Sequence, residues 1–482
     1  MNGYRQSTSP VSENRPIVKR MNIRMTFIAV CVSSLLFAGT LAAQKQQPPA
    51  PGTPRPFTLP EVVGYSLPNG TEVRLVQYGN IPKVSVQLVV QTGNVDETAE
   101  QVWLADLVGD LMQQGTTTRS AQDIALAAAR MGGSLDIGVG VNQVTIGGDV
   151  LSEFAGDMVG LVGDVATSPA FPAAELPRLK NDMLRQLSIA RSQPQQLAVE
   201  KFRQVIYPEH GYGRVFPTEA AINGYTLEQA RDFYNSNFGG ARSTLYVVGR
   251  FDDAAVRQAA QNAFGSWRRG SDPSKVAVTP KSERAVYLID RPGAVQSTIL
   301  MGVPVITPAD DDYLPLLVTN TLLGGYFSSR VTANIREAKG YTYSPFSQIS
   351  SRLGSAYYAQ QADVTTAVTG ESLKEIFYEI DRLQKEPPSA PELQAVKNYL
   401  SGTFVLQNSS RGGIINQLAF LDLHGLSEDY LRTYVQRVNA LTPADIQRMA
   451  SEYVDTGNMT IVVVGDRATI LDQITPYGRV IQ

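Results

Sequence analysis

Apolar and polar residues alternate along this chain in two ways, and each way predicts a different kind of element. Short, almost wholly apolar runs at 84–90 (VSVQLVV) and 244–249 (TLYVVG) predict buried strands. Segments in which apolar residues recur every three or four positions, such as 226–238 (TLEQARDFYNSNF), predict amphipathic helices. Both kinds of element occur throughout the chain, which predicts a fold built from sheets and helices.

The order of these elements repeats. The predicted helix 442–454 (TPADIQRMASEYV) is followed by the predicted strand 460–465 (TIVVVG), just as 226–238 is followed by 244–249. Each second copy lies 216 residues after the first, as 442 against 226 and 460 against 244 show. A period this long indicates a duplicated domain and is far too long for a solenoid repeat.

Each half also opens alike, with a strand that leads through a turn into a helix. Strand 84–90 precedes a helix from about Ala99, and strand 297–303 (STILMGV) precedes a helix from about Tyr313. We therefore expect an α+β fold of two domains, each with an antiparallel-rich sheet packed on one side by helices.

The predicted domain limits follow from the repeat and from composition. The first domain spans 58–268 and the second 285–475, and the polar, proline-punctuated segment 269–284 (RGSDPSKVAVTPKSER) links them. The chain has 482 residues with 43% hydrophobic content, which is enough for two buried cores. Its net charge of −3 provides no broad cationic surface, so nucleic acid is not an expected partner.

Residues 1–43 have the pattern of a secretory signal peptide. A basic stretch precedes the apolar run 25–41, which ends in small residues and is too short for a stable membrane span. Residues 44–57 then form a proline-rich linker. The one cysteine, Cys31, lies within the predicted signal, so the mature chain has no disulfide. We expect export to a bacterial periplasm, with no membrane span after the signal is cleaved. The alternative is that the signal is retained as a membrane anchor.

The segment 322–347 (LLGGYFSSRVTANIREAKGYTYSPFS) carries the most suggestive chemistry. Its apolar residues have helical spacing as far as Ala338, and Gly340 follows where a helix ends. Arg336 is then in the last helical turn, and Tyr343 is on an outgoing strand. A cation beside a phenol, with no acidic partner, suits binding of a peptide carbonyl or a developing oxyanion. The alternative is an arginine at a helix C-terminus beside core tyrosines.

This segment resembles the second-half signature of the pitrilysin/insulinase (M16) metallopeptidases. In that family an arginine and a tyrosine seven residues later complete an active site whose zinc lies on another domain, and here these residues are Arg336 and Tyr343. The stretch 210–214 (HGYGR) also resembles the family, and the similarity covers nearly all of 58–475. The resemblance implies two duplicated M16-like (LuxS/MPP-like) domains.

The zinc motif of the active family members is degenerate in this chain. The family motif H-x-x-E-H supplies two zinc ligands and a general base from the first long helix, here predicted at 102–112. Alignment on the following Gly-Thr pair places Asp106 and Asp110 at the histidine positions and Gly109 at the base position. The distant glutamate ligand is expected in the helix 176–192, which contains none, and Gln186 is near its position.

We expect no metal site and no cofactor in this chain. Its two histidines, His210 and His424, are far apart in sequence, and we expect structural roles for both. His210 is expected to bond its loop to the sheet, and His424 to lie at a helix end favoured by the dipole. Asp106 and Asp110 could bind a hard cation through oxygen and support an independent hydrolase, but a solvated acidic helix face is the preferred interpretation.

These observations predict a catalytically incomplete M16-like subunit of a periplasmic zinc peptidase. The resemblance implies a heterodimer in which a partner subunit bearing H-x-x-E-H provides the zinc. Arg336 and Tyr343 would bind the peptide substrate, which pairs with a sheet edge, and would stabilise the oxyanion. The alternative function is a non-enzymatic structural or peptide-binding module of the cell envelope with the same fold.

Overall fold

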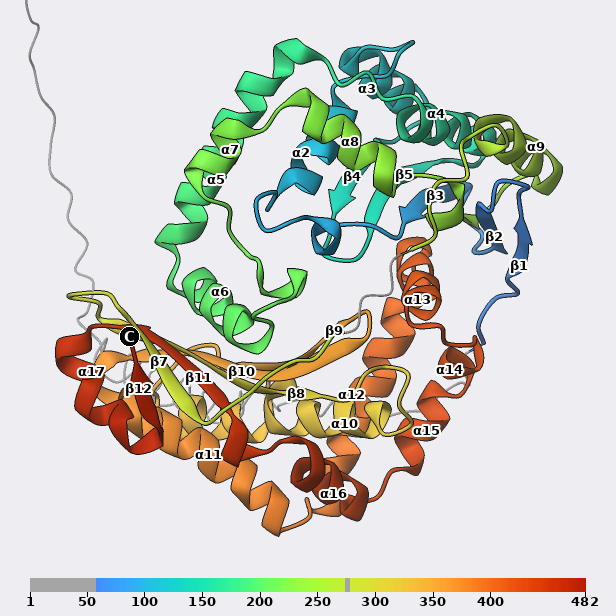
Figure 1. Cartoon of the computed structure of the whole chain (residues 1–482). Coiled ribbons are helices and arrows are strands. Elements are labelled where there is room, and N and C mark those ends of the chain that lie inside the picture. The colour runs from blue at the N-terminus through green and yellow to red at the C-terminus, as the bar shows by residue number, and fades with distance from the viewer. Residues whose placement is uncertain (1–57, 274–277) are drawn as a thin grey trace, which may run out of the picture. The chain divides into compact units, whose positions relative to one another are not determined.

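The computed structural model of this chain describes residues 58–273 and 278–482 (Figure 1). The predicted signal peptide and the whole of the predicted proline-rich linker lie outside the described residues. No helix in the described part of the chain is both long enough and apolar enough to cross a membrane.

The first half contains a six-stranded mixed sheet. Its strand order is β1-β2-β6-β3-β5-β4, and every neighbouring pair is antiparallel except β2 with β6. The strands are β1 (Val63–Ser66), β2 (Glu72–Gln77), β3 (Lys83–Val90), β4 (Asp136–Val139), β5 (Val144–Leu151) and β6 (Ser243–Gly249).

The second half contains a sheet of the same size, in the order β12-β7-β11-β8-β10-β9. Here β12 with β7 and β7 with β11 are parallel, and the other three pairs are antiparallel. Both sheets are thus rich in antiparallel pairs, as expected. The strands are β7 (Ala285–Asp290), β8 (Gln296–Val305), β9 (Phe346–Arg352), β10 (Ser355–Thr365), β11 (Thr460–Gly465) and β12 (Arg479–Ile481).

The duplication predicted from the sequence is visible in the order of the strands. The run β2-β6-β3-β5-β4 corresponds to β7-β11-β8-β10-β9, and the central strands β6 and β11 end at Gly249 and Gly465, 216 residues apart. Helices α8 (Leu227–Asn237) and α16 (Pro443–Tyr453) precede these strands. Each begins with a threonine capping box, at Thr226 and Thr442, which satisfies free backbone N–H groups of the first turn.

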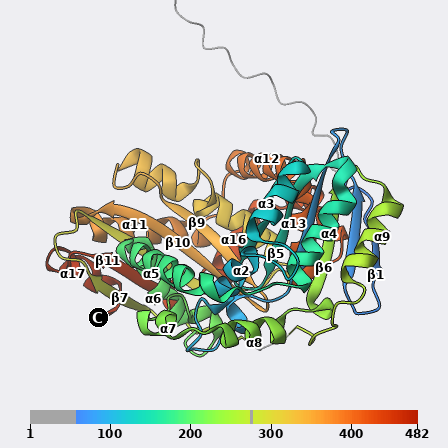
Figure 2. The ribbon, with the colours of Figure 1, turned by 90° about the horizontal axis from the view of Figure 1, so that it is seen from above.

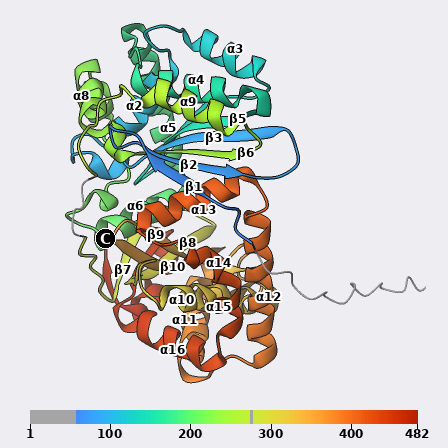
Figure 3. The ribbon, with the colours of Figure 1, turned by 90° about the vertical axis from the view of Figure 1, so that its right-hand side faces the viewer.

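Helices of each half cover one face of that half's own sheet. In the first half, α4 and α9 lie on the face opposite α13 (Figure 3), and α2 packs into the same core as α4. The helices of this half are α2 (Leu104–Gln113), α3 (Ala121–Arg130), α4 (Ala155–Thr167), α5 (Leu176–Ser192), α6 (Pro194–Ile206), α7 (Glu219–Gly224), α8 and α9 (Asp253–Phe264).

In the second half, α10, α11 and α16 cover the corresponding face. The helices of this half are α10 (Tyr313–Asn320), α11 (Thr369–Lys385), α12 (Ala390–Gln407), α13 (Arg411–His424), α14 (Asp429–Arg432), α15 (Tyr434–Ala440), α16 and α17 (Arg467–Ile474). Two π-helical segments, η6 (Thr321–Gly325) and η7 (Thr332–Ala338), follow α10.

The other face of each sheet is covered by a helix from the other half. Helix α6 packs on β8 and β11 of the second sheet (Figures 1 and 2), and α13 packs on β3 and β6 of the first. Phe202 of α6 contacts Tyr357 at 5.3 Å between ring centroids, and the Tyr246 hydroxyl of β6 donates to Asp422 of α13 at 2.6 Å. Helices of each half thus cover one side of their own sheet, as expected, and the second side is covered by a helix from the other half.

This exchange explains why the central strands are apolar without alternation. Successive side chains of a strand point to opposite faces. In β6, Leu245 and Val247 enter the core of the first half, whereas Tyr246 and Val248 pack against α13. A strand buried on both faces is apolar at nearly every position, as the run TLYVVG is.

Candidate functional site

Arg336 lies between two aromatic rings in the second half of the chain. Its guanidinium carbon is 4.4 Å from the ring centroid of Phe327 and 4.9 Å from that of Tyr343. A guanidinium stacked on aromatic faces is held by cation–π attraction and keeps its N–H edge available for hydrogen bonds. The structure thus brings together the two residues that the sequence singled out.

Both rings are largely open to solvent. Tyr343 is 80% exposed and Phe327 is 64% exposed, whereas the Arg336 side chain is 24% exposed. Exposure of this extent contradicts the alternative interpretation in which Tyr343 is a core tyrosine. It leaves the phenol free to contact another molecule.

The backbone around this group differs from the prediction in two respects. Arg336 lies on a π-helix, η7, in place of the expected α-helix, and Ala338 is exposed because the wider turn displaces it from the face of Val331 and Ile335. Tyr343 lies in the loop before β9 and not on a strand. Gly340 ends the helix with φ of 65°, the left-handed conformation expected there.

Arg336 also has an acidic neighbour, which the sequence interpretation excluded. Its Nε lies 3.1 Å from Oε1 of Glu337, whose side chain is 58% exposed. An ion pair this exposed contributes little, on the order of 0–1 kcal/mol, so it does not fix the guanidinium as a structural group.

The positions of the degenerate zinc motif lie on α2 of the first half. Asp106 is mostly buried and accepts a hydrogen bond from Asn94 Nδ2 at 2.7 Å, and its burial raises its pKa to about 6. Burial, reinforced by the negative charge of Asp182, also raises the pKa of Asp110. The expected solvated acidic face was therefore wrong, because neither aspartate is on an exposed surface.

Gly109, at the position of the general base, is packed against strand β4. A Cβ atom built there would lie 2.7 Å from Cγ2 of Val139. A separation below 3.0 Å forces the neighbouring side chain to move. The space that a glutamate would need is filled by Val139.

Gln186 is exposed on α5, and the acidic residue that faces α2 is Asp182, one helical turn earlier. Asp182 is paired with Arg178 at 3.1 Å and with Arg185 at 3.1 Å. Asp182 could have been identified from the sequence, because it is the one acidic residue of this helix and lies four positions before Gln186.

Glu97 is a further buried carboxyl group, next to the first turn of α2, and the sequence interpretation missed it. It accepts hydrogen bonds from the backbone N–H groups of Trp103 at 3.0 Å and Ala105 at 2.9 Å, and from Asn94 at 3.1 Å. Its burial outweighs these bonds and raises its pKa to about 8. Glu97 thus anchors the first turn of α2, and no sequence pattern links it to that turn.

These residues do not fit zinc. Imidazole or thiolate ligands are absent from α2 and α5. Asp106 accepts a hydrogen bond from Asn94, Asp182 is paired with arginine, and Val139 fills the position of the base. No group of three or more His, Cys, Asp or Glu side chains within residues 58–273 and 278–482 is arranged to hold a metal ion.

The histidines have local roles. His210 Nδ1 accepts from the backbone N–H of Tyr212 at 3.2 Å, so it stabilises its own loop and does not bond that loop to the sheet. His424 is the last residue of α13, as expected, but its burial against Phe420 lowers its pKa to about 4. It is therefore neutral near pH 7 and gains nothing from the helix dipole.

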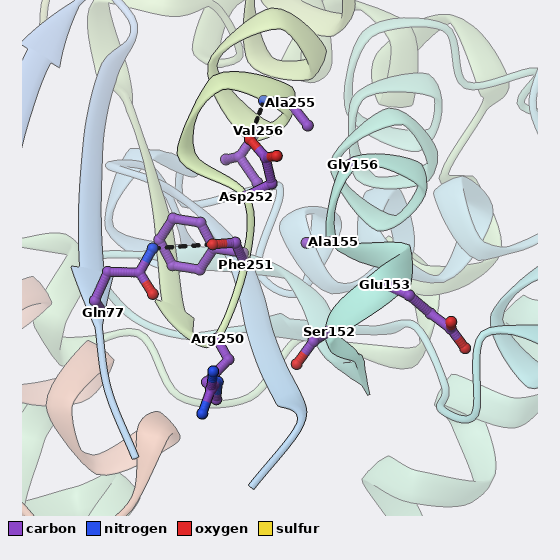
Figure 4. A pocket seen from close by; sticks show the side chains of 10 residues that line it. All are labelled: Gln77, Ser152, Glu153, Ala155, Gly156, Arg250, Phe251, Asp252, Ala255 and Val256. Carbon is purple, nitrogen blue, oxygen red and sulfur yellow. Dashed lines mark hydrogen bonds between the residues drawn. The ribbon is translucent and has the colours of Figure 1, made fainter. Parts of the chain in front are cut away.

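A separate pocket of about 360 Å³ lies where the N-termini of α4 and α9 meet (Figure 4). Arg250, Glu153 and Asp252 line it, and Gln77 Nε2 donates to the Phe251 carbonyl across it at 3.0 Å. None of the predicted site residues lines this pocket, and its two acidic groups offset the one arginine.

Comparisons with known proteins agree with this architecture. Residues 73–215 match the family described as insulinase (peptidase family M16), and residues 224–400 match the peptidase M16 inactive domain. An uncharacterised zinc protease of Streptomyces coelicolor is 23% identical over 395 residues, which are 80% of this chain and 86% of that protein. The uncharacterised zinc protease YmxG of Bacillus subtilis is 22% identical over 80% of this chain and 93% of its own length.

Two solved structures have the same fold. A peptidase M16 inactive domain from Pseudomonas fluorescens matches with a TM-score of 0.77 and 22% identity, over 84% of this chain and 98% of that chain. A protease from Helicobacter pylori matches with a TM-score of 0.78 and 18% identity, over 84% and 100%. With two M16-like halves and family matches that follow one another along the chain, this protein belongs to peptidase family M16.

Proposed function

We propose that this chain is a non-catalytic M16 subunit that completes the active site of a zinc-bearing partner. The observation that carries the proposal is the exposed Tyr343–Arg336–Phe327 stack, in a chain whose own motif does not fit zinc. A structural subunit has no need of an arginine held open between two exposed rings. The partner would be an M16 subunit bearing H-x-x-E-H, and the pair would form a heterodimer.

In this proposal Arg336 and Tyr343 act on the scissile carbonyl of a bound peptide. The guanidinium N–H groups and the phenol O–H would donate to the carbonyl oxygen as it becomes negative. Phe327 would keep the guanidinium plane oriented. The partner would supply zinc, which activates water for hydrolysis. The peptide would pair with a sheet edge, and β4 is one terminal strand that offers it.

Export to a periplasm is part of the proposal and rests on the composition of residues 1–43.

A peptide-binding or structural envelope module without catalysis is the second candidate function. The free edge of β4, which pairs only with β5 among the described strands, favours it, because strand addition needs no catalytic group. The two candidates differ in what Tyr343 does.

The test is the variant Tyr343→Phe in the assembled complex. Loss of one oxyanion donor lowers kcat by about two orders of magnitude elsewhere, and the same decrease is expected here with little change in KM. Tyr399→Phe is the matched control, because Tyr399 is also exposed and its ring only packs against Tyr326. Unchanged turnover in Tyr343→Phe would exclude the complementation and favour the binding module.

A further inference from the structure

Two arginines, one from each half, meet where α6 packs on the second sheet (Figure 1). Arg203 lies on α6, and Arg352 is the last residue of β9. Both contact Tyr212, which follows α6. Arg203 Nε donates to the Tyr212 carbonyl at 2.7 Å, and the guanidinium carbon of Arg352 lies 5.3 Å from the Tyr212 ring centroid. The residues of the function proposed above take no part, so this junction is independent of that function.

Arg352 has no hydrogen-bond partner among the described residues. It is 9% exposed, and its guanidinium also lies 5.9 Å from the ring centroid of Tyr357. Its Nε is buried and unpaired. Its Nη1 and Nη2 also donate to no described residue, but neither atom is fully buried. These two nitrogens are therefore open to a molecule that enters from solvent.

Arg203 is incompletely paired in the same way. Apart from the bond of Nε to the Tyr212 carbonyl, its guanidinium donates to no described residue, and its Nη1 and Nη2 are not fully buried either. Burial, and then the positive charge of Arg352, lower the pKa of Arg203. The two guanidinium groups are thus close enough to repel each other, in a place where water screens them poorly.

No carboxylate of the described residues compensates for these two charges, because neither arginine forms an ion pair with one. Asp96 acts electrostatically on Tyr212, but its carboxylate is directed to Arg242, with 3.8 Å between the charged atoms. His210, whose ring centroid is 4.4 Å from that of Tyr212, has a pKa lowered by burial and so adds no positive charge near pH 7. Buried charge without a partner is destabilising, so the junction favours an anion.

We propose that this junction binds a small oxyanion with two negative charges, phosphate or sulfate. One oxygen accepts from the terminal N–H groups of Arg203 and another from those of Arg352, so the ion balances both guanidinium charges. Guanidinium groups suit this ligand because their planar N–H edge matches two oxygens of such an anion. The small exposure of Arg352 favours a free ion over the phosphate group of a larger molecule. The bound ion joins the two halves of the chain.

Calorimetric titration of the full chain with phosphate, and separately with sulfate, tests this proposal, with chloride holding the ionic strength constant. Saturable binding of one ion per chain is expected for at least one of the two. Adenosine monophosphate should bind at least tenfold more weakly than phosphate, because its ester group is too large for the junction. Absence of saturable binding for both ions would overturn the proposal. Adenosine monophosphate that binds as tightly as the free ions would overturn the assignment to a small ion.

Variants locate the binding. Arg203→Gln and Arg352→Gln should each weaken it at least tenfold, because each removes one of the two guanidinium groups. Arg231→Gln, at an exposed position of α8, is the matched control and should bind as the wild type does. A saturating concentration of the ion should raise the unfolding temperature of the wild type by about 1–3 °C and leave that of Arg352→Gln unchanged. The same unfolding curves show whether each variant is folded, and folded variants with wild-type affinity would contradict the assignment.

Discussion

At the scale of single residues, both the packing and the available ligands of α2 make the first half a poor fit for zinc. Asp106 and Asp110 replace imidazoles with carboxyl groups whose pKa values are raised by burial. At Gly109 a general base is absent, and Val139 of β4 also occupies the space that a glutamate side chain would need. Placing histidines and a glutamate on α2 would therefore not by itself create a zinc site.

A double-mutant cycle tests the contact at Gly109. Gly109→Ala alone gains helix propensity of about 1 kcal/mol, but its Cβ lies 2.7 Å from Val139 Cγ2 and overpacks the site. Val139→Ala removes that clash. We expect Gly109→Ala to be more favourable by about 0.5–3 kcal/mol when Val139 is alanine. Free energies of unfolding from urea denaturation measure this coupling, and additive effects would contradict the packing.

Glu97 predicts a dependence of stability on pH. Folding raises its pKa from 4.5 to about 8, so the folded state binds more protons than the unfolded state between these values. The free energy of unfolding should therefore decrease as the pH rises from about 4.5 to about 8. Glu97→Gln does not titrate, and the wild type should lose stability relative to this variant across the same range. A constant difference between the two proteins would contradict the burial of an uncharged Glu97.

At the scale of elements, regular segments could be predicted and local irregularities could not. The strand 460–465 and the helix 176–192 have their predicted limits because both have strong periodic patterns. The π-helical turn of η7 has no sequence signature, because its apolar spacing is that of an ordinary helix. The same limit applies to Glu97, because its bonds to α2 join residues that no periodicity relates.

Only part of the candidate site could be predicted, because the sequence pattern relates residues that are close along the chain. Arg336 and Tyr343 are seven residues apart, and a helix followed by a turn at Gly340 brings them close. Phe327 lies before the helix, and only the folded chain places it against Arg336. The sequence predicted Gln186, but the residue of α5 that faces α2 is Asp182, one helical turn earlier. The position that faces a neighbouring helix depends on how the two helices pack.

The repeated helix caps give a prediction for equivalent elements. Thr226 and Thr442 each accept from a backbone N–H in the first turn, at 3.2 and 3.3 Å. Replacing either by alanine leaves that group without its partner and should cost about 1 kcal/mol of unfolding free energy. Similar losses in the two variants are expected because the two caps have the same geometry. A negligible loss in both, measured by urea denaturation, would contradict the role of the caps.

At the scale of the whole molecule, the two halves stabilise each other by exchanging helices. Helix α6 of the first half fills the second face of the second sheet, and α13 does the same for the first sheet. Removal of either half would expose the second face of the remaining sheet to solvent. The duplicated halves should therefore unfold together.

The variant Phe202→Ala tests this coupling. Phe202 is 1% exposed and contacts the second sheet, so its truncation should cost about 3–5 kcal/mol. Fluorescence and circular dichroism should still report one coincident unfolding transition. Leu126→Ala, at a position that is 45% exposed on α3, is the control with little expected effect. Two separate transitions in the wild type would show that the halves are independent.

The central proposal is that this subunit completes the active site of a zinc-bearing partner, and isolation of the tagged protein from its native envelope tests it most directly. Mass spectrometry of the co-purifying chains and zinc analysis of the complex give the result. We predict a stoichiometric M16 chain that bears H-x-x-E-H and one zinc ion for each pair of subunits. Recovery of this chain alone, or with an unrelated assembly that lacks zinc, would contradict the proposal.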